Sequence, residues 1–235
     1  MTDRPAAPGR SGYHHGDLRN ALTRAATALA REGGPQAVVL RAAARATGVS
    51  PTAAYRHFRG QGDLLRAVKF EALARLADRM EAAGADHPGA DGESVVARLR
   101  SAGRAYVRFA LDEPGLFRAA FSHHPDPTAS MGGARSEVPS AAEEFCPEAG
   151  AWDDRAFRLL SDVMDALLDA GLLAPERRPG AEVSAWAAVH GVAMLLLDGP
   201  LSHLSSAQAE TAIVRTVDDM LRGILEAPSG ETHGT

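Results

Sequence analysis

Several side chains in one short segment are of the types that proteins use to bind nucleic acid. Tyr55 and His57 can donate hydrogen bonds to phosphate oxygens, and the hydroxyl of Thr52 can reach the edge of a base. Thr52 and the neighbouring Ala53 are small, so they allow a close approach to DNA. These residue types predict a surface that contacts duplex DNA, provided that the backbone presents them on one side.

The elements that would position these side chains are two short helices joined by a tight turn. We expect the first helix over residues 40–47 and the second over residues 51–58. Gly48 stands where the backbone must turn, because glycine tolerates the positive φ that other residues resist. Ser50 is a good N-cap, and Pro51 suits the first helical position. The pattern is typical of a helix-turn-helix, although two core helices with a polar turn would also fit.

The segment GVSPTAAYRHF, residues 48–58, strongly resembles the DNA-binding segment of the TetR/AcrR family of bacterial transcriptional regulators. The similarity covers residues 13–70 approximately. It departs from the family pattern at Gln61, where a lysine usually holds a phosphate, and at Gly62, where a helix former is common. Side-chain chemistry and the resemblance together predict a set of DNA-binding residues: Arg41, Ser50, Pro51, Thr52, Ala53, Tyr55, His57 and Gln61.

The charge distribution favours the same interpretation. The chain carries a formal net charge of −5, yet residues 1–70 hold 11 Lys and Arg against 4 Asp and Glu. The remaining residues hold 14 basic and 26 acidic side chains. A basic head on an acidic body suits a protein that presents one end to a polyanion.

Composition predicts an all-α protein. The resemblance implies that its N-terminal helix-turn-helix DNA-binding domain is followed by a larger helical ligand-binding and dimerisation domain. Alanine is frequent, and β-branched and aromatic residues are too sparse for a sheet protein. No apolar run reaches the roughly 18 residues of a membrane span. The single cysteine, Cys146, and the missing secretory signal indicate the cytoplasm.

Breaks in helical periodicity divide the chain into five parts. We expect a flexible basic arm over 1–12, a DNA-binding domain over 13–62, a connecting helix over 63–83, a helical effector-binding and dimerisation domain over 84–226, and a disordered tail over 227–235. Asp17 and Asp63 are the predicted N-caps of the first and the connecting helix. Residues 122–149 have little periodicity and predict a loop.

Residues 185–199, AWAAVHGVAMLLLDG, resemble the C-terminal domain of one TetR subgroup that is named for its Trp, His and Gly, here Trp186, His190 and Gly191. Residues 105–121 resemble an upstream part of that domain. Gly191 stands in mid-helix, which predicts a close approach of a second helix. The family resemblance implies a homodimer formed by the last two long helices, over 180–197 and 207–226.

The aromatic residues of the body form either an apolar effector cavity or a plain core. Residues expected to bind an effector are Tyr106, Phe109, Phe117, Phe121, Trp152, Trp186 and His190. His190 has three interpretations: a core histidine with its own partner, a polar anchor in a ligand cavity, or a catalytic base. No nucleophile-elbow pattern supports a triad of Ser184, His190 and Asp198, so we predict no catalytic residue.

The histidine pair at 14–15 does not predict a metal site, because neighbours in sequence do not share a helix face and no third ligand is near. The pair at 123–124 could be metal ligands or a solvated loop pair, and we favour the solvated pair. We therefore expect neither metal nor cofactor. The expected protein is a homodimeric repressor, not an enzyme, with no membrane contact. It binds a palindromic double-stranded DNA operator and is released by an unidentified small-molecule effector. The alternatives are an all-α dimeric enzyme or carrier whose head is only an interaction module, and a DNA-binding protein with no effector.

Overall fold

The structure, a computed structural model, describes residues 15–122 and 154–225 and consists there of helices and no strand. Its α-helices are α1 (His15–Gly33), α2 (Leu40–Ala46), α3 (Pro51–Tyr55), α4 (Gln61–Gly84), α5 (Gly92–Asp112), α6 (Pro114–Ala120), α8 (Asp154–Asp169), α9 (Ala181–Leu197) and α10 (Ser206–Leu225). Short 3-10 helices cover Pro35–Ala37 and Pro175–Arg177. The predicted all-α class, with a helix-turn-helix followed by a helical domain, is confirmed.

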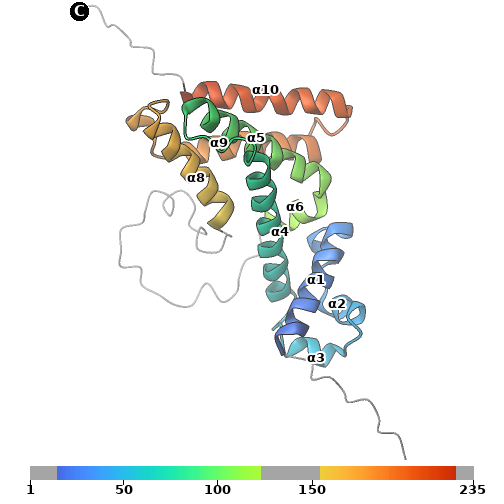
Figure 1. Cartoon of the computed structure of the whole chain (residues 1–235). Coiled ribbons are helices and arrows are strands. Elements are labelled where there is room, and N and C mark those ends of the chain that lie inside the picture. Colours follow the sequence, from blue (N-terminus) through green and yellow to red (C-terminus); the bar gives the residue numbers. More distant parts are fainter. Residues whose placement is uncertain (1–14, 123–153, 226–235) are drawn as a thin grey trace, which may run out of the picture.

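A small head and a larger body share the long helix α4 (Figure 1). In the head, α1, α2 and α3 pack around the first turns of α4 and bury a compact apolar core. Its fully buried members include Leu22, Val38, Ala44, Phe58 and Leu64. The periodicity of α1 creates this core, because Leu22, Ala26 and Ala30 recur every four residues on one face.

Two predicted N-caps are wrong. α1 begins at His15, so Asp17 lies in its first turn. α4 begins at Gln61 behind Gly60, so Asp63 also lies in a first turn, where its carboxylate accepts a hydrogen bond from the Arg59 amide at 3.1 Å. An acid in the first turn of a helix stabilises its partly positive N-terminus without occupying the cap position. The acids at the helix starts were therefore recognised, but each is the third residue of its helix and not the cap that precedes it.

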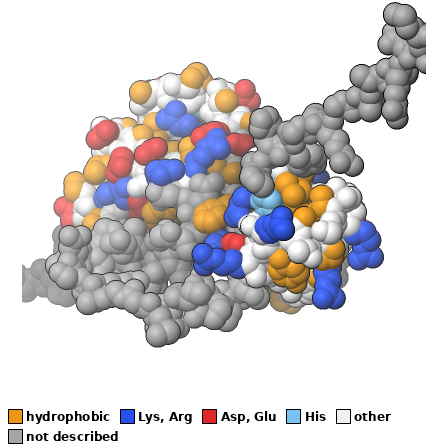
Figure 2. Space-filling model, turned by 90° about the horizontal axis from the view of Figure 1, so that it is seen from below, with side chains coloured by type: hydrophobic (Ala, Val, Ile, Leu, Met, Phe, Trp, Pro, Cys, Tyr) orange, Lys and Arg blue, Asp and Glu red, His pale blue; other side chains and the backbone are white. Residues whose placement is uncertain are grey.

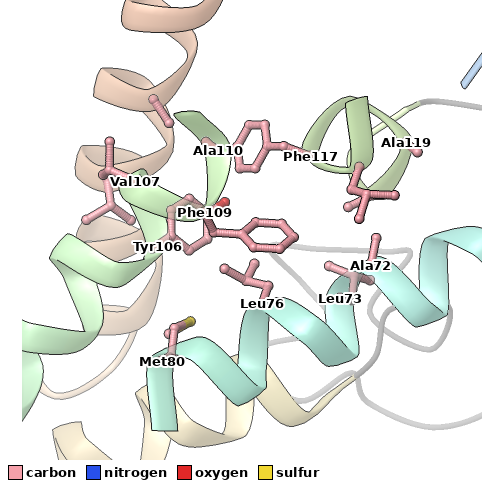
Figure 3. Close-up of a cluster of buried hydrophobic side chains, with 14 of the residues drawn as sticks. Ala72, Leu73, Leu76, Met80, Tyr106, Val107, Phe109, Ala110, Phe117 and Ala119 are labelled. Atoms are coloured by element: carbon pink, nitrogen blue, oxygen red, sulfur yellow. The ribbon is translucent and has the colours of Figure 1, made fainter. Parts of the chain in front are cut away.

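The body is built on α5, which packs against α4, α8, α9 and α10. Asp91 caps α5 by accepting a hydrogen bond from the Ser94 amide at 3.0 Å, and this bond lowers the pKa of the Asp91 carboxyl. Gly103 of α5 faces α9 and α10, because a Cβ there would be in ordinary van der Waals contact, at 3.4–3.5 Å, with Val217 and Val189. Figure 3 shows the core where Leu76 of α4 meets Phe109 of α5.

The short helix α6 joins the body to the head. At its start, a Cβ on Gly115 would lie 2.2 Å from the carbonyl oxygen of Ala30, so the backbones of α6 and α1 are in direct contact. Arg31 of α1 donates two hydrogen bonds, of 2.6 and 3.0 Å, to the carboxylate of Glu113. Arg118 binds Asp198, the residue after α9, in the same two-pronged way at 3.0 and 2.6 Å. α6 is thus attached to the head at one end and to α9 at the other.

The predicted helix–helix approach at Gly191 is wrong within one subunit, because a Cβ there would meet nothing within 4 Å. Helix bounds elsewhere differ from the expected ones by one to three residues. Gly180, for example, precedes α9 with a φ of +75°.

Among the described helices, none is both long enough and apolar enough to cross a membrane. Several predictions concern residues that the structure does not describe: Cys146, Trp152, the arm over 1–12, the tail over 227–235, and residues 123–149 of the predicted loop 122–149.

Replacing Gly115 with alanine tests the contact between α6 and α1. We expect G115A to lower the free energy of unfolding by about 2 kcal/mol, because a methyl group 2.2 Å from a backbone oxygen forces both helices to move. Urea denaturation at a fixed protein concentration measures the change. G223A is the matched control, since a Cβ at Gly223 of α10 meets nothing within 4 Å. Equal stability of the two variants would contradict the close contact.

Candidate nucleic-acid interface and internal pocket

The turn between α2 and α3 has the geometry that its sequence predicts. Gly48 adopts a φ of +70°, and Ser50 accepts a hydrogen bond on its Oγ from the Ala53 amide at 3.2 Å. Pro51 occupies the first turn of α3. α3 ends at Tyr55, three residues earlier than expected, and the chain continues as a turn. Phe58 nevertheless remains fully buried, because its amide still bonds to the Ala54 carbonyl and completes the turn.

The predicted DNA-binding residues lie on and around the exposed side of α3. Tyr55 is half-exposed, and Ala53 and His57 are partly buried. The exposed members of the set are Arg41, Ser50, Pro51, Thr52 and Gln61. Figure 2 views the molecule from the head side and shows Lys and Arg side chains around apolar and small polar ones, with few acids among them. The arrangement brings small residues and the predicted phosphate-binding side chains to one surface.

Arg19 of α1 holds the end of the α3 turn, and sequence reasoning missed it. Its guanidinium donates a hydrogen bond to the carbonyl of His57 and lies 4.3 Å from the centre of the Phe58 ring. A guanidinium over an aromatic face adds a cation–π attraction to that hydrogen bond. Because 38 residues separate Arg19 from His57, no local pattern could have indicated the contact.

The body contains a pocket of about 440 Å³ between α4, α5, α8 and α9. Its walls are largely aliphatic, and Leu76, Met80, Leu99, Leu160 and Val189 are among them. The wall residues that carry charges are Glu81 and Arg98, near the end of α4. A volume of this size and an apolar lining are typical of sites for small organic molecules.

A three-residue hydrogen-bond network joins α5 to α9 beside the pocket. The Tyr106 hydroxyl accepts a hydrogen bond from Trp186 Nε1 at 3.0 Å and lies 2.9 Å from His190 Nδ1, to which it can donate. Burial raises the pKa of the Tyr106 phenol well above its usual range, and burial lowers the pKa of His190. Neutral His190 therefore serves as the acceptor for the neutral phenol, so all three polar groups have partners.

The structure places the predicted effector residues in two groups. Tyr106, Phe121 and Trp186 line the pocket. Phe109 and Phe117 are buried in the core and are not among its lining residues, and His190 stacks against Phe117 at 5.5 Å between ring centres. The aliphatic walls and Arg98 had no distinctive sequence signal, because leucines at helical spacing predict burial without indicating a void. The described residues contain no group of three side chains that could hold a metal ion.

Comparisons with known proteins identify both parts of the chain. The family model of bacterial regulatory proteins of the tetR family matches residues 22–68, and the model of the tetracyclin repressor-like C-terminal domain matches residues 99–220. The second match alone spans just over half of the chain. It does not confirm the Trp-His-Gly subgroup, which stays a prediction. A search of curated proteins found no match.

Solved structures share the fold at low sequence identity. A protein of unknown function from Rhodococcus sp. RHA1 is 24% identical with a TM-score of 0.66, and the alignment covers 92% of this chain and 100% of that one. A tetR-family transcriptional regulator from Mesorhizobium loti is 16% identical with a TM-score of 0.61, covering 90% and 98%. The family models therefore carry the identification: the chain belongs to the TetR family of bacterial regulatory proteins and is a DNA-binding transcriptional regulator.

Proposed function

We propose that the protein is a repressor that binds a palindromic operator as a homodimer and leaves it when a small molecule fills the pocket. The observation that carries this proposal is that one helix serves both sites. Leu64 and Val68 of α4 are buried in the core of the head. Leu76 and Met80 of the same helix line the pocket. A change in the pocket wall must therefore act on the element that supports the DNA-binding surface.

In this proposal residues 13–62 form the DNA-binding unit, and α3 enters the major groove. Thr52 and Ala53 contact base edges, while Arg41, Tyr55, His57 and Gln61 hold phosphates. Two heads related by a twofold axis would place their recognition helices about 34 Å apart, or somewhat more, to meet successive major grooves. Arg19 fixes the end of the α3 turn, so it acts as a positioning residue.

The exposed face of α9 supports a dimer interface formed by α9 and α10. Met194 and Leu195 are 39% and 42% exposed, and Ala187 and Gly191 leave the same helix free of bulky side chains. Apolar surface of this kind is usually covered in the assembled protein. A partner helix close to Gly191 would also explain why a glycine stands in mid-helix, since nothing in its own subunit does.

Release would follow from movement of α4 and α6 against the head. Phe121, at the end of α6, lines the pocket, and Gly115 at the other end presses on α1. A ligand that displaces Phe121 shifts α6, and the shift reaches α1 because the Gly115 contact leaves no space to absorb it. The ligand must bind the released arrangement more tightly than the DNA-bound one, since only differential affinity can shift the equilibrium.

Replacement of Arg41 and Tyr55 tests the DNA-binding surface. On a duplex selected from random DNA, we expect R41Q to reduce the slope of log affinity against log salt by about 1, because one phosphate contact is lost. We expect Y55F to weaken binding about fivefold, the effect of one hydrogen bond. Fluorescence anisotropy at several salt concentrations measures both effects.

The matched control for R41Q is R108Q, which removes a similarly exposed arginine from α5 in the body and should leave the salt slope unchanged. Equal effects of R41Q and R108Q would contradict the assignment of the head as the interface. If no duplex is enriched and the affinity for DNA does not depend on salt, the head is only an interaction module and the protein is a carrier.

Replacement of Leu195 tests the dimer. We expect L195D to weaken dimerisation at least about 30-fold, because an unsatisfied buried polar group costs about 1–3 kcal/mol and twofold symmetry buries two of them. Sedimentation equilibrium measures the dissociation constant. F70D is the control, since Phe70 on α4 is exposed to a similar degree, 40%, away from α9 and α10. If L195D leaves the dissociation constant of the dimer unchanged and F70D raises it, the interface does not lie at Leu195.

A further inference from the structure

We propose that the pocket takes an amphipathic anion, a molecule with one apolar tail and one carboxylate or phosphate head, whose head binds Arg98. The inference rests on the proposed function, because it names the class of effector that the pocket would bind. It depends on how polar groups are distributed along the pocket. At one end the polar groups are hydrogen-bonded to each other. At the other end the guanidinium of Arg98 has no acidic partner among the described residues.

The inner end of the pocket lies beside Tyr106 and Trp186, whose hydrogen-bond donors are already used. The indole N–H of Trp186 donates to the Tyr106 hydroxyl, and this hydroxyl can donate its one proton to His190 Nδ1, so neither group is left to donate to a ligand. The residues around it on the wall, which include Leu73, Leu76 and Val189, are aliphatic. A polar group placed here would lose its hydrogen bonds to water without replacement, so this end selects hydrocarbon.

The opposite end opens to solvent near the C-terminus of α4. Among the described lining residues, the exposed ones are Glu81, Ala85 and Pro88, which identifies the mouth. Arg98 lines the pocket at this end. Its stem packs on Gly84, where a Cβ would lie 2.9 Å from the Arg98 Cγ.

Arg98 is held in place but not neutralised. Its Nη1 donates a hydrogen bond to the carbonyl of His87 at 3.2 Å, and no carboxylate of the described residues lies within ion-pair distance of it. A guanidinium has five N–H donors in a planar fork that suits carboxylate and phosphate oxygens. The remaining donors are therefore suited to an anionic head that arrives with the ligand.

Glu81 does not favour a cationic head, although it lines the same mouth. Arg155 of α8 binds both Glu81 and Asp78, and its bond to Asp78 measures 2.6 Å. The carboxylate of Glu81 is thus already compensated by a protein cation. Arg98 and the engaged Glu81 together leave the mouth more receptive to an anion than to an ammonium group.

The length of the pocket fits a tail of medium length. Arg98 and Tyr106 both face the pocket from α5, and eight residues of helix span about 12 Å. A decyl chain has a similar extended length. Decanoate and decyl phosphate are therefore suitable probes, with decanol and decylammonium as head-group controls that carry the same tail.

The test measures binding of these four probes, each below its micellar concentration, to the DNA-free protein by isothermal titration calorimetry. We expect at least one of the two anions to bind about tenfold more tightly than decanol, as a charge-assisted hydrogen bond predicts. R98M keeps the stem on Gly84 but removes the charge, and it should abolish this preference, so that neither anion binds more tightly than decanol; a preference for anions that survives R98M would contradict the role of Arg98. Comparing the affinity for decanoate with that for decyl phosphate shows whether the site prefers a carboxylate or a phosphate head.

The matched control is R100M, because Arg100 lies on the same helix, binds Asp218 at 2.9 Å and does not line the pocket. It should retain the preference for anions. The proposal is overturned if decanol binds as tightly as both anions, if decylammonium binds most tightly, or if no probe binds. Operator affinity of ligand-free R98M is measured separately, so a failure of DNA binding is distinguished from a failure of the ligand assignment.

Discussion

The continuity of α4 is the constraint on which the rest of the structure depends. An α-helix transmits displacement along its axis because each backbone hydrogen bond fixes the next turn. Leu64 at one end is buried in the head, and Met80 at the other is buried against the pocket. Neither end can change its packing without acting on the other, since interiors are close-packed and do not deform freely. The proposed release of DNA needs this property, because the DNA-binding surface and the pocket lie at different ends of α4.

α6 gives the proposed coupling a direct path to the head. The ion pairs Arg31–Glu113 and Arg118–Asp198 lie at the surface and are only partly buried, and surface pairs contribute about 1 kcal/mol or less. The contact of Gly115 with the backbone of α1 is different, because two backbones cannot move aside as side chains can. We therefore attribute the connection between pocket and head chiefly to steric contact through α4 and α6, with the ion pairs setting the orientation of α6.

The helix-turn-helix could be predicted almost residue by residue, whereas the pocket could not. Gly48, Ser50 and Pro51 act through their own backbone geometry, so their roles are visible in the sequence. A pocket is a space between helices, and periodicity shows which face of a helix is buried without showing whether that face meets another side chain or a void. Phe109 and Phe117 were expected at the pocket for this reason, but they fill the core beside it. The contacts of Arg19 and Arg98 depend on tertiary neighbours and had no local signal.

The emission of Trp186 tests most directly whether the head and the pocket are coupled. The chain has two tryptophans, so a W152F variant leaves Trp186, in the pocket wall, as the sole reporter. The account predicts that titration with a selected operator duplex changes this emission with the same midpoint as DNA binding, because binding at the head reshapes the pocket through α4 and α6. Emission that stays constant while the duplex saturates the protein would contradict the coupling.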